Sequence, residues 1–477
     1  MVEHVGGSFR DPCSRVYAIS DTTVSGGIRI LRGIDEETKV NFETLVAQDF
    51  YKTLLKEGRL VNSKLVDDKG DKAAADIVIK NGWAGVLEHQ TIPFINYPYE
   101  WTFGMLRMAA LLHLRLLTDA LNNGWTLKDS TPFNIQFVGC RPVFIDLPSF
   151  VPWEEGEPWL AYRQFCSCFL TPLLMRAHLG IDHLPIMRSY IDGIPPTEAV
   201  KFFNGLSRFK KGVMSHIIFP AEVENRIASK ERDAVPAKKR QAAAHKKPMV
   251  LGLVDSMTRL VQSLTVDIGH TDWSDYDQTH TYDNKDHELK KSFVESVVAG
   301  KDAAFIWDIG CNTGTFSQIS AAYADNVIAV DGDHNAIEKL FQAERAKKKD
   351  TPILPLVLNL ANLSPNQGWA GEERSAFDER VKPDVVLVLA LVHHIRISSN
   401  IPMDLFLDWL RRLECDVVIE FINREDEMVV KLLTNKKVQY KDYNIETFVS
   451  QIEQSFNIAS REKLKDGKRE IFHLTPA

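Results

Sequence analysis

The chain has 477 residues, of which 44% are hydrophobic and 25% are charged. At roughly 150 residues per domain, this length predicts more than one domain, and the composition excludes a disordered chain or a small disulfide-stabilised fold. Lys and Arg number 57 against 64 Asp and Glu, so the net charge is −7. This charge excludes a general binder of nucleic acid or anionic membrane, although it leaves room for a local basic patch.

The cysteines and the apolar segments indicate the compartment. Only Cys166 and Cys168 of the six cysteines lie close together, and one C-x-C pair is not the spacing of a zinc site, so we predict free thiols and no metal. The first fifteen residues contain no apolar signal segment, and the longest apolar run, Val385–Val392, is too short to cross a bilayer. We therefore expect a cytoplasmic protein without membrane insertion.

The first part of the chain, residues 1–225, predicts a mixed α+β domain. Short β-like runs come first, and a long amphipathic helix follows, whose apolar residues recur at steps of three and four. Two further β-like segments and another helical stretch complete this part. The predicted elements are strands at Arg15–Ile19, Gly27–Leu31 and Gly85–Glu88, a helix at Glu100–Asn123, strands at Ile135–Val138 and Pro142–Ile145, and a helix around Trp159–His178.

A basic segment separates the two halves. Residues Arg226–Lys247 contain eight Lys or Arg against two acids and almost no large apolar side chain. Such a composition is typical of a solvated linker or an exposed helix. We assign residues 226–250 to a linker, and we see no clear nucleic-acid binding segment in it.

The second half, residues 251–477, alternates strands with helices. This alternation predicts a parallel, doubly wound α/β sheet of the Rossmann type. Asp466–Gly467 between two alternating runs is a strong hairpin signal, so the sheet is expected to close with antiparallel strands. The predicted strands are Ala304–Ile309, Asn326–Val330, Val385–Leu391, Asp416–Phe421, Asn457–Leu464 and Arg469–Thr475, and a helix is predicted from about Thr315.

The most informative motif follows the first of these strands. Asp308, Gly310, Asn312 and Gly314 occupy a tight turn between a buried strand and a helix. A dinucleotide-binding turn needs glycine at its first, third and sixth positions, and here Asn312 and Thr315 stand at the last two. The turn resembles the S-adenosylmethionine motif acid-x-Gly-x-Gly-x-Gly, with Asn312 at a position where a small polar residue tolerates a positive φ. The glycines are expected to let backbone amides approach the cofactor.

Polar residues follow the next two strands. Asp331 ends the second strand, where a carboxylate can accept both ribose hydroxyls of a nucleoside at the switch point of the sheet. Asn359 and Asn362 follow the expected third strand, and a side-chain amide offers both a donor and an acceptor to an adenine edge. We therefore predict S-adenosylmethionine as the cofactor of a class I methyltransferase domain.

Methyl transfer to a hydroxyl or an amine also needs removal of a proton. His393 and His394 follow the fourth strand, and imidazole titrates near neutral pH. Glu420, at the end of the next strand, is the second candidate base. Trp273, Tyr276 and Tyr282 either cover the cofactor, because aromatic rings attract a sulfonium, or pack against a helix.

The first half resembles the catalytic loop of kinases and aminoglycoside-type phosphotransferases. The resemblance lies in Asp129, in Asn134 five residues further on, and in Asp146 after a strand pair. It implies that Asp129 orients a hydroxyl and that Asn134 and Asp146 hold magnesium with ATP. No glycine-rich phosphate loop precedes them, and Arg29, Arg32 and Lys39 are the candidates for the strand cation, so we predict a degenerate kinase-like domain.

Over most of its length the chain resembles the NoeA-like family of host-specific nodulation proteins. This resemblance implies an S-adenosylmethionine-dependent methyltransferase domain joined to an N-terminal domain. The resemblance does not identify the methyl acceptor, and we expect a hydroxylated small molecule or a saccharide-containing compound. The alternatives are a bifunctional methyltransferase and ATP-dependent phosphotransferase, and a non-catalytic module that binds S-adenosylmethionine. The resemblance is carried by Tyr97–Trp101, Leu127–Asp146, Asp192–Pro195, the Asp308 turn, Leu389–Ile395 and Glu420–Leu433.

Overall fold

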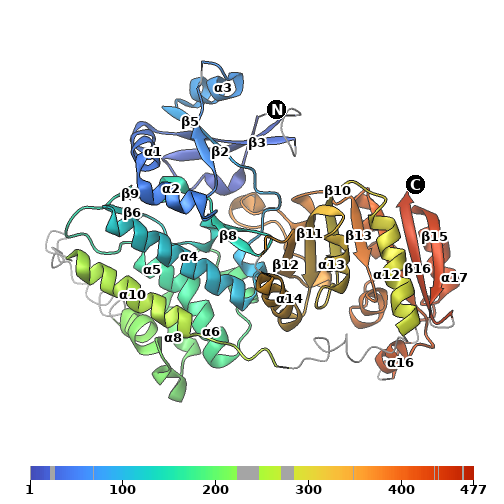
Figure 1. Cartoon of the computed structure of the whole chain (residues 1–477). Helices are drawn as coiled ribbons and strands as arrows, with labels where there is room; N and C mark the ends of the chain where they lie inside the picture. Colours follow the sequence, from blue (N-terminus) through green and yellow to red (C-terminus); the bar gives the residue numbers. More distant parts are fainter. Residues whose placement is uncertain are drawn as a thin grey trace. The chain divides into compact units, whose positions relative to one another are not determined.

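The computed structural model describes residues 2–21, 27–67, 69–222, 246–269, 284–347, 349–434, 436–438, 440–464 and 467–477. They fall into two compact units (Figure 1). Unit 1 comprises Met1–Val138, Pro142–Asp267 and Gln367–Arg374, and unit 2 comprises Gly139–Arg141, Ile268–Asn366 and Ser375–Ala477.

Unit 1 begins with a five-stranded antiparallel sheet, in the order β1-β2-β3-β5-β4. The three strands predicted here are confirmed as β2, β3 and β5. Helices α1, α2 and α3 accompany the sheet, and Leu31, Ile77 and Val86 belong to its buried core. The bounds are β1 Val2–His4, β2 Ser14–Ser20, β3 Ile28–Ile34, α1 Glu36–Ala47, α2 Asp49–Lys56, β4 Ser63–Leu65, α3 Lys72–Asn81 and β5 Gly85–His89.

The rest of unit 1 is mostly helical. Its longest helix, α4, is capped by Thr102, whose hydroxyl accepts a hydrogen bond from the Met105 amide, and it is buried along most of its length. Two short strand pairs, the antiparallel β6 with β9 and β7 with β8, flank the predicted catalytic-type loop. The bounds are α4 Phe103–Asn122, β6 Trp125–Leu127, β7 Ile135–Val138, β8 Arg141–Phe144, β9 Phe150–Pro152, α5 Tyr162–Phe165, α6 Thr171–Leu179, α7 Leu184–Ser189, α8 Pro196–Phe202 and α10 Lys247–Ser263.

Helix α10 begins inside the predicted linker. The division into units falls after Asp267, whereas the sequence places the boundary at residues 226–250. Val250, Val254, Met257 and Val261 form a buried stripe at helical spacing, and α10 packs beside α4 (Figure 1). This apolar stripe makes the end of the predicted linker part of a helix of unit 1. Residues 226–245 of that linker lie outside the described residues.

Unit 2 contains a seven-stranded sheet in the order β12-β11-β10-β13-β14-β16-β15. The first five strands are parallel, and β16 is antiparallel to both β14 and β15. The predicted doubly wound sheet with an antiparallel finish is therefore confirmed. The bounds are α12 Asn284–Val298, β10 Ala303–Ile309, α13 Thr315–Ser320, β11 Ala324–Asp331, α14 His334–Ala346, β12 Ile353–Val357, β13 Val385–Val388, α15 Met403–Arg412, β14 Asp416–Ile422, α16 Glu427–Leu433, α17 Ile445–Ile452, β15 Phe456–Leu464 and β16 Arg469–Pro476.

The order of the strands positions the site of unit 2. Strand β10 lies between β11 and β13, so successive strands are added on one side of β10 up to β12 and on its other side from β13 onward (Figure 1). Ligands of such sheets bind outside the carboxyl ends of the strands at this switch point. Ile306, Val385 and Leu387 are fully buried because helices cover both faces of the central strands.

Three further expectations concern single features. All six cysteines are free, as predicted. Within the described ranges, no helix combines the length and the apolar character that a bilayer crossing requires. Trp273, Tyr276 and Tyr282 lie outside the described residues.

The core of unit 2 yields a stability prediction. Leu387 of β13 is completely buried, so Leu387→Ala is expected to lower the free energy of unfolding of unit 2 by about 2–5 kcal/mol through lost burial and a cavity. Leu405→Ala on α15 is the control, because Leu405 is 60% exposed and should change that free energy by only about 0.5 kcal/mol. Denaturant titration measures both values, and equal effects of the two substitutions would contradict the assigned core.

Candidate functional site

The turn after β10 begins with a buried carboxyl group. Asp308 is 2% exposed, and its Oδ2 accepts a hydrogen bond of 2.6 Å from the Ser317 hydroxyl on α13. Burial raises the pKa of Asp308 to about 6, although the Ser317 hydrogen bond opposes this shift. The acid of the predicted motif therefore ties the end of the strand to the helix that follows, and it does not face solvent.

Both glycines of the turn are required by its geometry. Gly310 and Gly314 have φ of 79° and 88°, in the left-handed region that side chains disfavour. A Cβ on Gly314 would lie 2.5 Å from Leu340 Cδ1, and one on Gly310 would lie 3.3 Å from Leu391 Cδ1. Asn312 has φ of 51°, which confirms the expectation of a polar residue with a positive φ at this position.

The amides of this turn are engaged within the chain. The N–H groups of Gly310 and Cys311 both donate to the Val330 carbonyl, at 2.8 and 3.1 Å, and the Gly314 N–H donates to Cys311 O at 2.9 Å. This differs from the expectation that these amides approach a cofactor directly. The Gly310 and Cys311 amides therefore hold the turn against β11, and the Gly314 amide closes it.

Asp331 lies against the turn, at the carboxyl end of β11. Its Oδ2 accepts from the Asn312 N–H at 2.9 Å, and its Oδ1 accepts from the Asp333 N–H at 2.8 Å. Burial raises the pKa of Asp331, and the backbone hydrogen bonds oppose the shift. The Gly332 amide also interacts with this carboxylate, and a carboxylate has about four lone-pair sites, so Asp331 retains acceptor capacity for a ligand hydroxyl.

The two asparagines after β12 are close to Asp331 in the chain fold. The Leu358 N–H donates to Asp331 O at 2.8 Å, which places Asn359 beside the loop after β11. The Asn359 side chain caps a short 3-10 helix through the Ala361 amide, at 2.9 Å. Asn359 and Asn362 are both exposed at this edge. The structure therefore brings Asp331 and Asn359 together, as the sequence predicts.

Glu420 lies in a buried ionic network. Its side chain is 0% exposed, and its Oε2 accepts from Lys290 Nζ at 2.7 Å. Arg469 Nη1 lies 3.7 Å from Glu420 Oε1, and Arg469 Nε donates to Asp426 Oδ2 at 2.8 Å. The network, here called the Glu420 network, comprises Lys290, Glu420, Asp426 and Arg469, with two cations and two anions. An isolated buried charge is strongly unfavourable, so this charge balance is a requirement of the fold.

The Glu420 network also shapes the loop after β13. Glu420 Oε2 accepts a second hydrogen bond, of 2.9 Å, from the Ala390 N–H. Ala390 has φ of 52°, an unfavourable value for a residue with a Cβ. Strand β13 therefore ends at Val388, and the prediction that it continues to Leu391 is wrong. The turn at Ala390 directs the chain toward His393.

The two histidines lie side by side at the start of a π-helical turn, His394–Ser398. Their ring centroids are 4.0 Å apart. His393 is 2% exposed, and burial together with the positive charge of Arg469 holds its pKa well below the usual value. Burial lowers the pKa of His394, which is half-buried, to about 4. Both imidazoles are therefore neutral at pH 7.

Lys290, Asp426 and Arg469 were missed by the sequence reasoning. Lys290 lies on the amphipathic helix α12, where a lysine is normally exposed, yet its Nζ lies 4.8 Å from the centroid of the Phe316 ring, just after the glycine turn. Arg469 begins the last strand. No local pattern marks these residues, because their partners are far apart in the chain.

In unit 1, the three residues of the kinase-like loop do lie together. Asn134 Nδ2 donates to Asp146 Oδ2 at 3.3 Å, and Arg32 of β3 forms an ion pair of 2.5 Å with Asp146 Oδ1. Burial and the charge of Asp146 raise the pKa of Asp129. Across the described ranges, no group of three or more His, Cys, Asp or Glu residues is placed to hold a metal ion. Arg32 is one of the three residues predicted as the strand cation. Its ion pair neutralises Asp146, which the resemblance assigns to magnesium binding.

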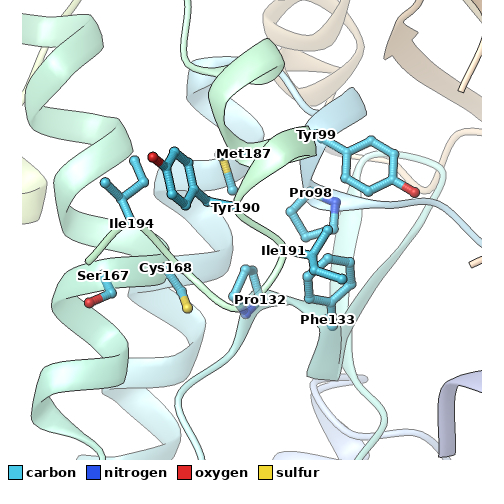
Figure 2. A pocket seen from close by; sticks show the side chains of 11 residues that line it. Pro98, Tyr99, Pro132, Phe133, Ser167, Cys168, Met187, Tyr190, Ile191 and Ile194 are labelled. Atoms are coloured by element: carbon cyan, nitrogen blue, oxygen red, sulfur yellow. The ribbon is translucent and has the colours of Figure 1, made fainter. Parts of the chain in front are cut away.

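A small apolar pocket adjoins this loop. Figure 2 shows Pro98, Tyr99 and Phe133 at one side of it, with Cys168 and Ile194 across from them. The Arg374 guanidinium lies 4.4 Å from the centroid of the Phe133 ring. Phe133 precedes Asn134 in the loop, and the space inside the pocket is about that of a single water molecule.

Comparisons with known proteins give one extensive match. The nodulation protein NoeA of Rhizobium meliloti (strain 1021) is 33% identical over 470 residues, which cover 98% of this chain and 95% of NoeA. The crystal structure of the N-methyltransferase NodS from Bradyrhizobium japonicum WM9 is 13% identical, with a TM-score of 0.30, and the match covers 41% of this chain and 99% of NodS. The bifunctional kinase-methyltransferase WbdD is 17% identical, with a TM-score of 0.30, over 43% of this chain and 42% of WbdD. No protein-family model matches the chain.

The Glu420 network yields a prediction of energetic coupling. Lys290→Met leaves a buried carboxylate without its closest cation and is expected to lower the free energy of unfolding of unit 2 by about 3–5 kcal/mol. Adding Glu420→Gln should recover part of this loss, because the two side chains interact directly. Denaturant titration of the wild type, both single variants and the double variant measures the coupling.

The exposed pair Lys382 and Glu414 supplies the control, since their side chains are 68% and 69% exposed. Lys382→Met is expected to change the same free energy by less than about 1 kcal/mol. Strictly additive effects at Lys290 and Glu420 would contradict the assigned network.

Asp308 yields a prediction of pH dependence. Because its pKa is raised from 3.8 to about 6 in the folded state, the folded protein holds a proton that the unfolded chain has released between these values. The stability contribution of Asp308 is therefore present below pH 4 and is lost as the pH rises to 6, by about 2–3 kcal/mol. Asp308→Asn should remove this decline from the pH profile of unfolding. An unchanged difference between wild type and variant across this range would contradict the raised pKa.

Proposed function

The chain belongs to the NoeA family of nodulation proteins, and from the geometry of unit 2 we propose that it is an S-adenosylmethionine-dependent methyltransferase. One observation carries the proposal. The sheet of five parallel strands ends with the antiparallel β16, and Asp331 at the end of β11 contacts the glycine turn after β10. The first five strands have the same order as in the all-parallel dinucleotide-binding sheet. The antiparallel β16 distinguishes this sheet from it.

The residues at the switch point fit this cofactor. Asp331 retains acceptor capacity for a ribose hydroxyl, and its charge makes such a hydrogen bond strong. Asn359 and Asn362 are exposed beside it, and their amides can pair with the edge of an adenine ring. When bound, S-adenosylmethionine supplies an electrophilic methyl group on a sulfonium. Asp308, Gly310, Asn312 and Gly314 shape the turn that holds Asp331.

Removal of the acceptor proton is assigned to the histidine pair. His394 is half-buried, whereas His393 is enclosed, so His394 is the residue that an acceptor can reach. Its pKa of about 4 keeps a ring nitrogen unprotonated at pH 7, although it makes the imidazole a weak base. Such a base suits a hydroxyl or amine whose proton becomes acidic only as its bond to the methyl group forms. His393 holds the position of His394 by ring contact.

Glu420 is assigned a positioning role in place of proton removal. Both of its oxygens already contact cations of the Glu420 network, and Oε2 also holds the Ala390 amide. A carboxylate so engaged is a poor base, because protonation would break these contacts. It instead fixes the turn that leads to the histidines.

For unit 1 we propose recognition of a hydroxylated or saccharide-containing acceptor. Phosphate transfer is the second candidate, and the contact between Asn134 and Asp146 favours it. The ion pair of Arg32 with Asp146 opposes it, because it occupies the carboxylate that would hold magnesium. The pocket beside Phe133 has aromatic walls, and its interior takes little more than one water molecule (Figure 2).

Calorimetric titration tests the cofactor. We expect S-adenosylmethionine to bind and Asp331→Ala to weaken binding by about 1.5–3 kcal/mol, because the substitution removes charge-assisted hydrogen bonds. Asp325→Ala is the matched control, since Asp325 is an exposed carboxylate on the same strand. NAD should give no heat.

Three outcomes separate the alternatives. Equal affinity of the Asp331→Ala and Asp325→Ala variants, or binding of NAD, would refute the proposed cofactor site. Heat from ATP with magnesium that is lost in Asp146→Asn would support the bifunctional enzyme. Binding of S-adenosylmethionine without methylation of any compound in a metabolite library would favour the non-catalytic module.

A further inference from the structure

A short 3-10 helix of unit 1, η6 (Gly205–Phe209), carries two exposed apolar side chains. Leu206 is 86% exposed and Phe209 is 76% exposed. A 3-10 helix has three residues per turn, so side chains at positions i and i+3 lie directly above one another. Leu206 and Phe209 therefore project from the same side of η6. Single exposed apolar residues are ordinary, but two large ones on one side form a small apolar surface.

Exposed cations surround this apolar pair. Arg208, Lys210 and Lys211 are all exposed. Arg208 and Lys210 form no ion pair with another described residue, and the Lys211 ammonium donates to the Ser263 hydroxyl at 2.9 Å. The sequence contains no acid between Phe202 and Ala221. The chain has a net charge of −7, yet this segment forms a local basic patch of the kind that the overall charge does not exclude.

Hydrogen bonds and packing hold the segment in place. The Ser207 amide donates to Asn204 O, and the Lys210 amide donates to Ser207 O, both at 3.1 Å. Nε2 of His178 lies 3.0 Å from Lys211 O. Gly212 has φ of 85°, and a Cβ on it would lie 2.6 Å from Leu260 Cδ2 of α10. The segment is thus anchored to the helices of unit 1 while its apolar and basic side chains face outward.

We propose that η6 together with Arg208, Lys210 and Lys211, called here the η6 surface, docks on an anionic lipid bilayer. Leu206 and Phe209 enter the interfacial layer, and the three cations contact lipid phosphates. A nucleic acid would satisfy the cations but would leave two adjacent large apolar side chains in water. The docking is peripheral, and it needs no spanning helix and no activity of unit 2.

Vesicle co-sedimentation of the full chain tests the η6 surface. We expect binding to vesicles of phosphatidylcholine with about 30% phosphatidylglycerol, because apolar side chains and basic side chains together can anchor a protein to an anionic bilayer. Little binding is expected to vesicles of phosphatidylcholine alone. Arg208→Ser with Lys210→Ser should weaken binding roughly 20- to 30-fold at low salt, since each basic residue near an anionic surface contributes about fivefold. Leu206→Ser with Phe209→Ser should weaken it at least about tenfold at any salt concentration.

Leu160→Ser is the matched control. Leu160 is 70% exposed, but the neighbouring Glu154, Glu155 and Glu157 make its surroundings acidic. This variant should bind vesicles like the wild type, and unchanged circular dichroism of all variants shows that they fold. Absence of binding to anionic vesicles, or equal binding of the Leu206→Ser/Phe209→Ser variant, would overturn the proposal. Tighter binding to a single-stranded oligonucleotide, insensitive to the apolar substitutions, would assign the surface to nucleic acid instead.

Discussion

The buried carboxylate of Glu420 is the constraint on which unit 2 depends. A charge without solvent contact is tolerated only where opposite charges and hydrogen bonds surround it. Lys290 from α12, Arg469 from β16 and the Ala390 amide after β13 meet this requirement together. Three segments from distant parts of the chain are thereby joined at one point, directly beneath the loop that carries the histidines.

The sheet of unit 2 was largely predictable from the sequence. Buried parallel strands are continuous apolar runs, and an Asp-Gly turn between alternating runs indicates a hairpin, so most strand positions were found. The end of β13 was not, because Ala390 leaves the strand to donate to Glu420, a tertiary contact that no apolar run reveals. The division into units falls after Asp267, beyond the predicted linker, for a similar reason. The buried stripe of α10 begins at Val250, directly after a basic segment that has the composition of a linker, and composition alone does not reveal where the helix starts.

The candidate site was predictable only in part. Asp331 and Asn359 follow strands, and residues at the carboxyl ends of neighbouring parallel strands meet at one edge of a sheet. The charge partners of Glu420, and the pairing of Arg32 with Asp146, arise from long-range packing and leave no mark on local spacing. In unit 1 the ion pair of Arg32 with Asp146 argues against a magnesium site at the kinase-like loop. An acid that the sequence pattern indicates as a metal ligand is neutralised by Arg32, which lies more than one hundred residues earlier in the chain.

The place of β16 in the sheet has a consequence for biosynthesis. This strand follows every other strand of the sheet along the chain, yet it lies between β14 and β15 and carries Arg469. A nascent chain that has released only the parallel strands from the ribosome therefore exposes an open edge and an incompletely balanced charge. Closure of this unit therefore waits until Arg469 has emerged from the ribosome.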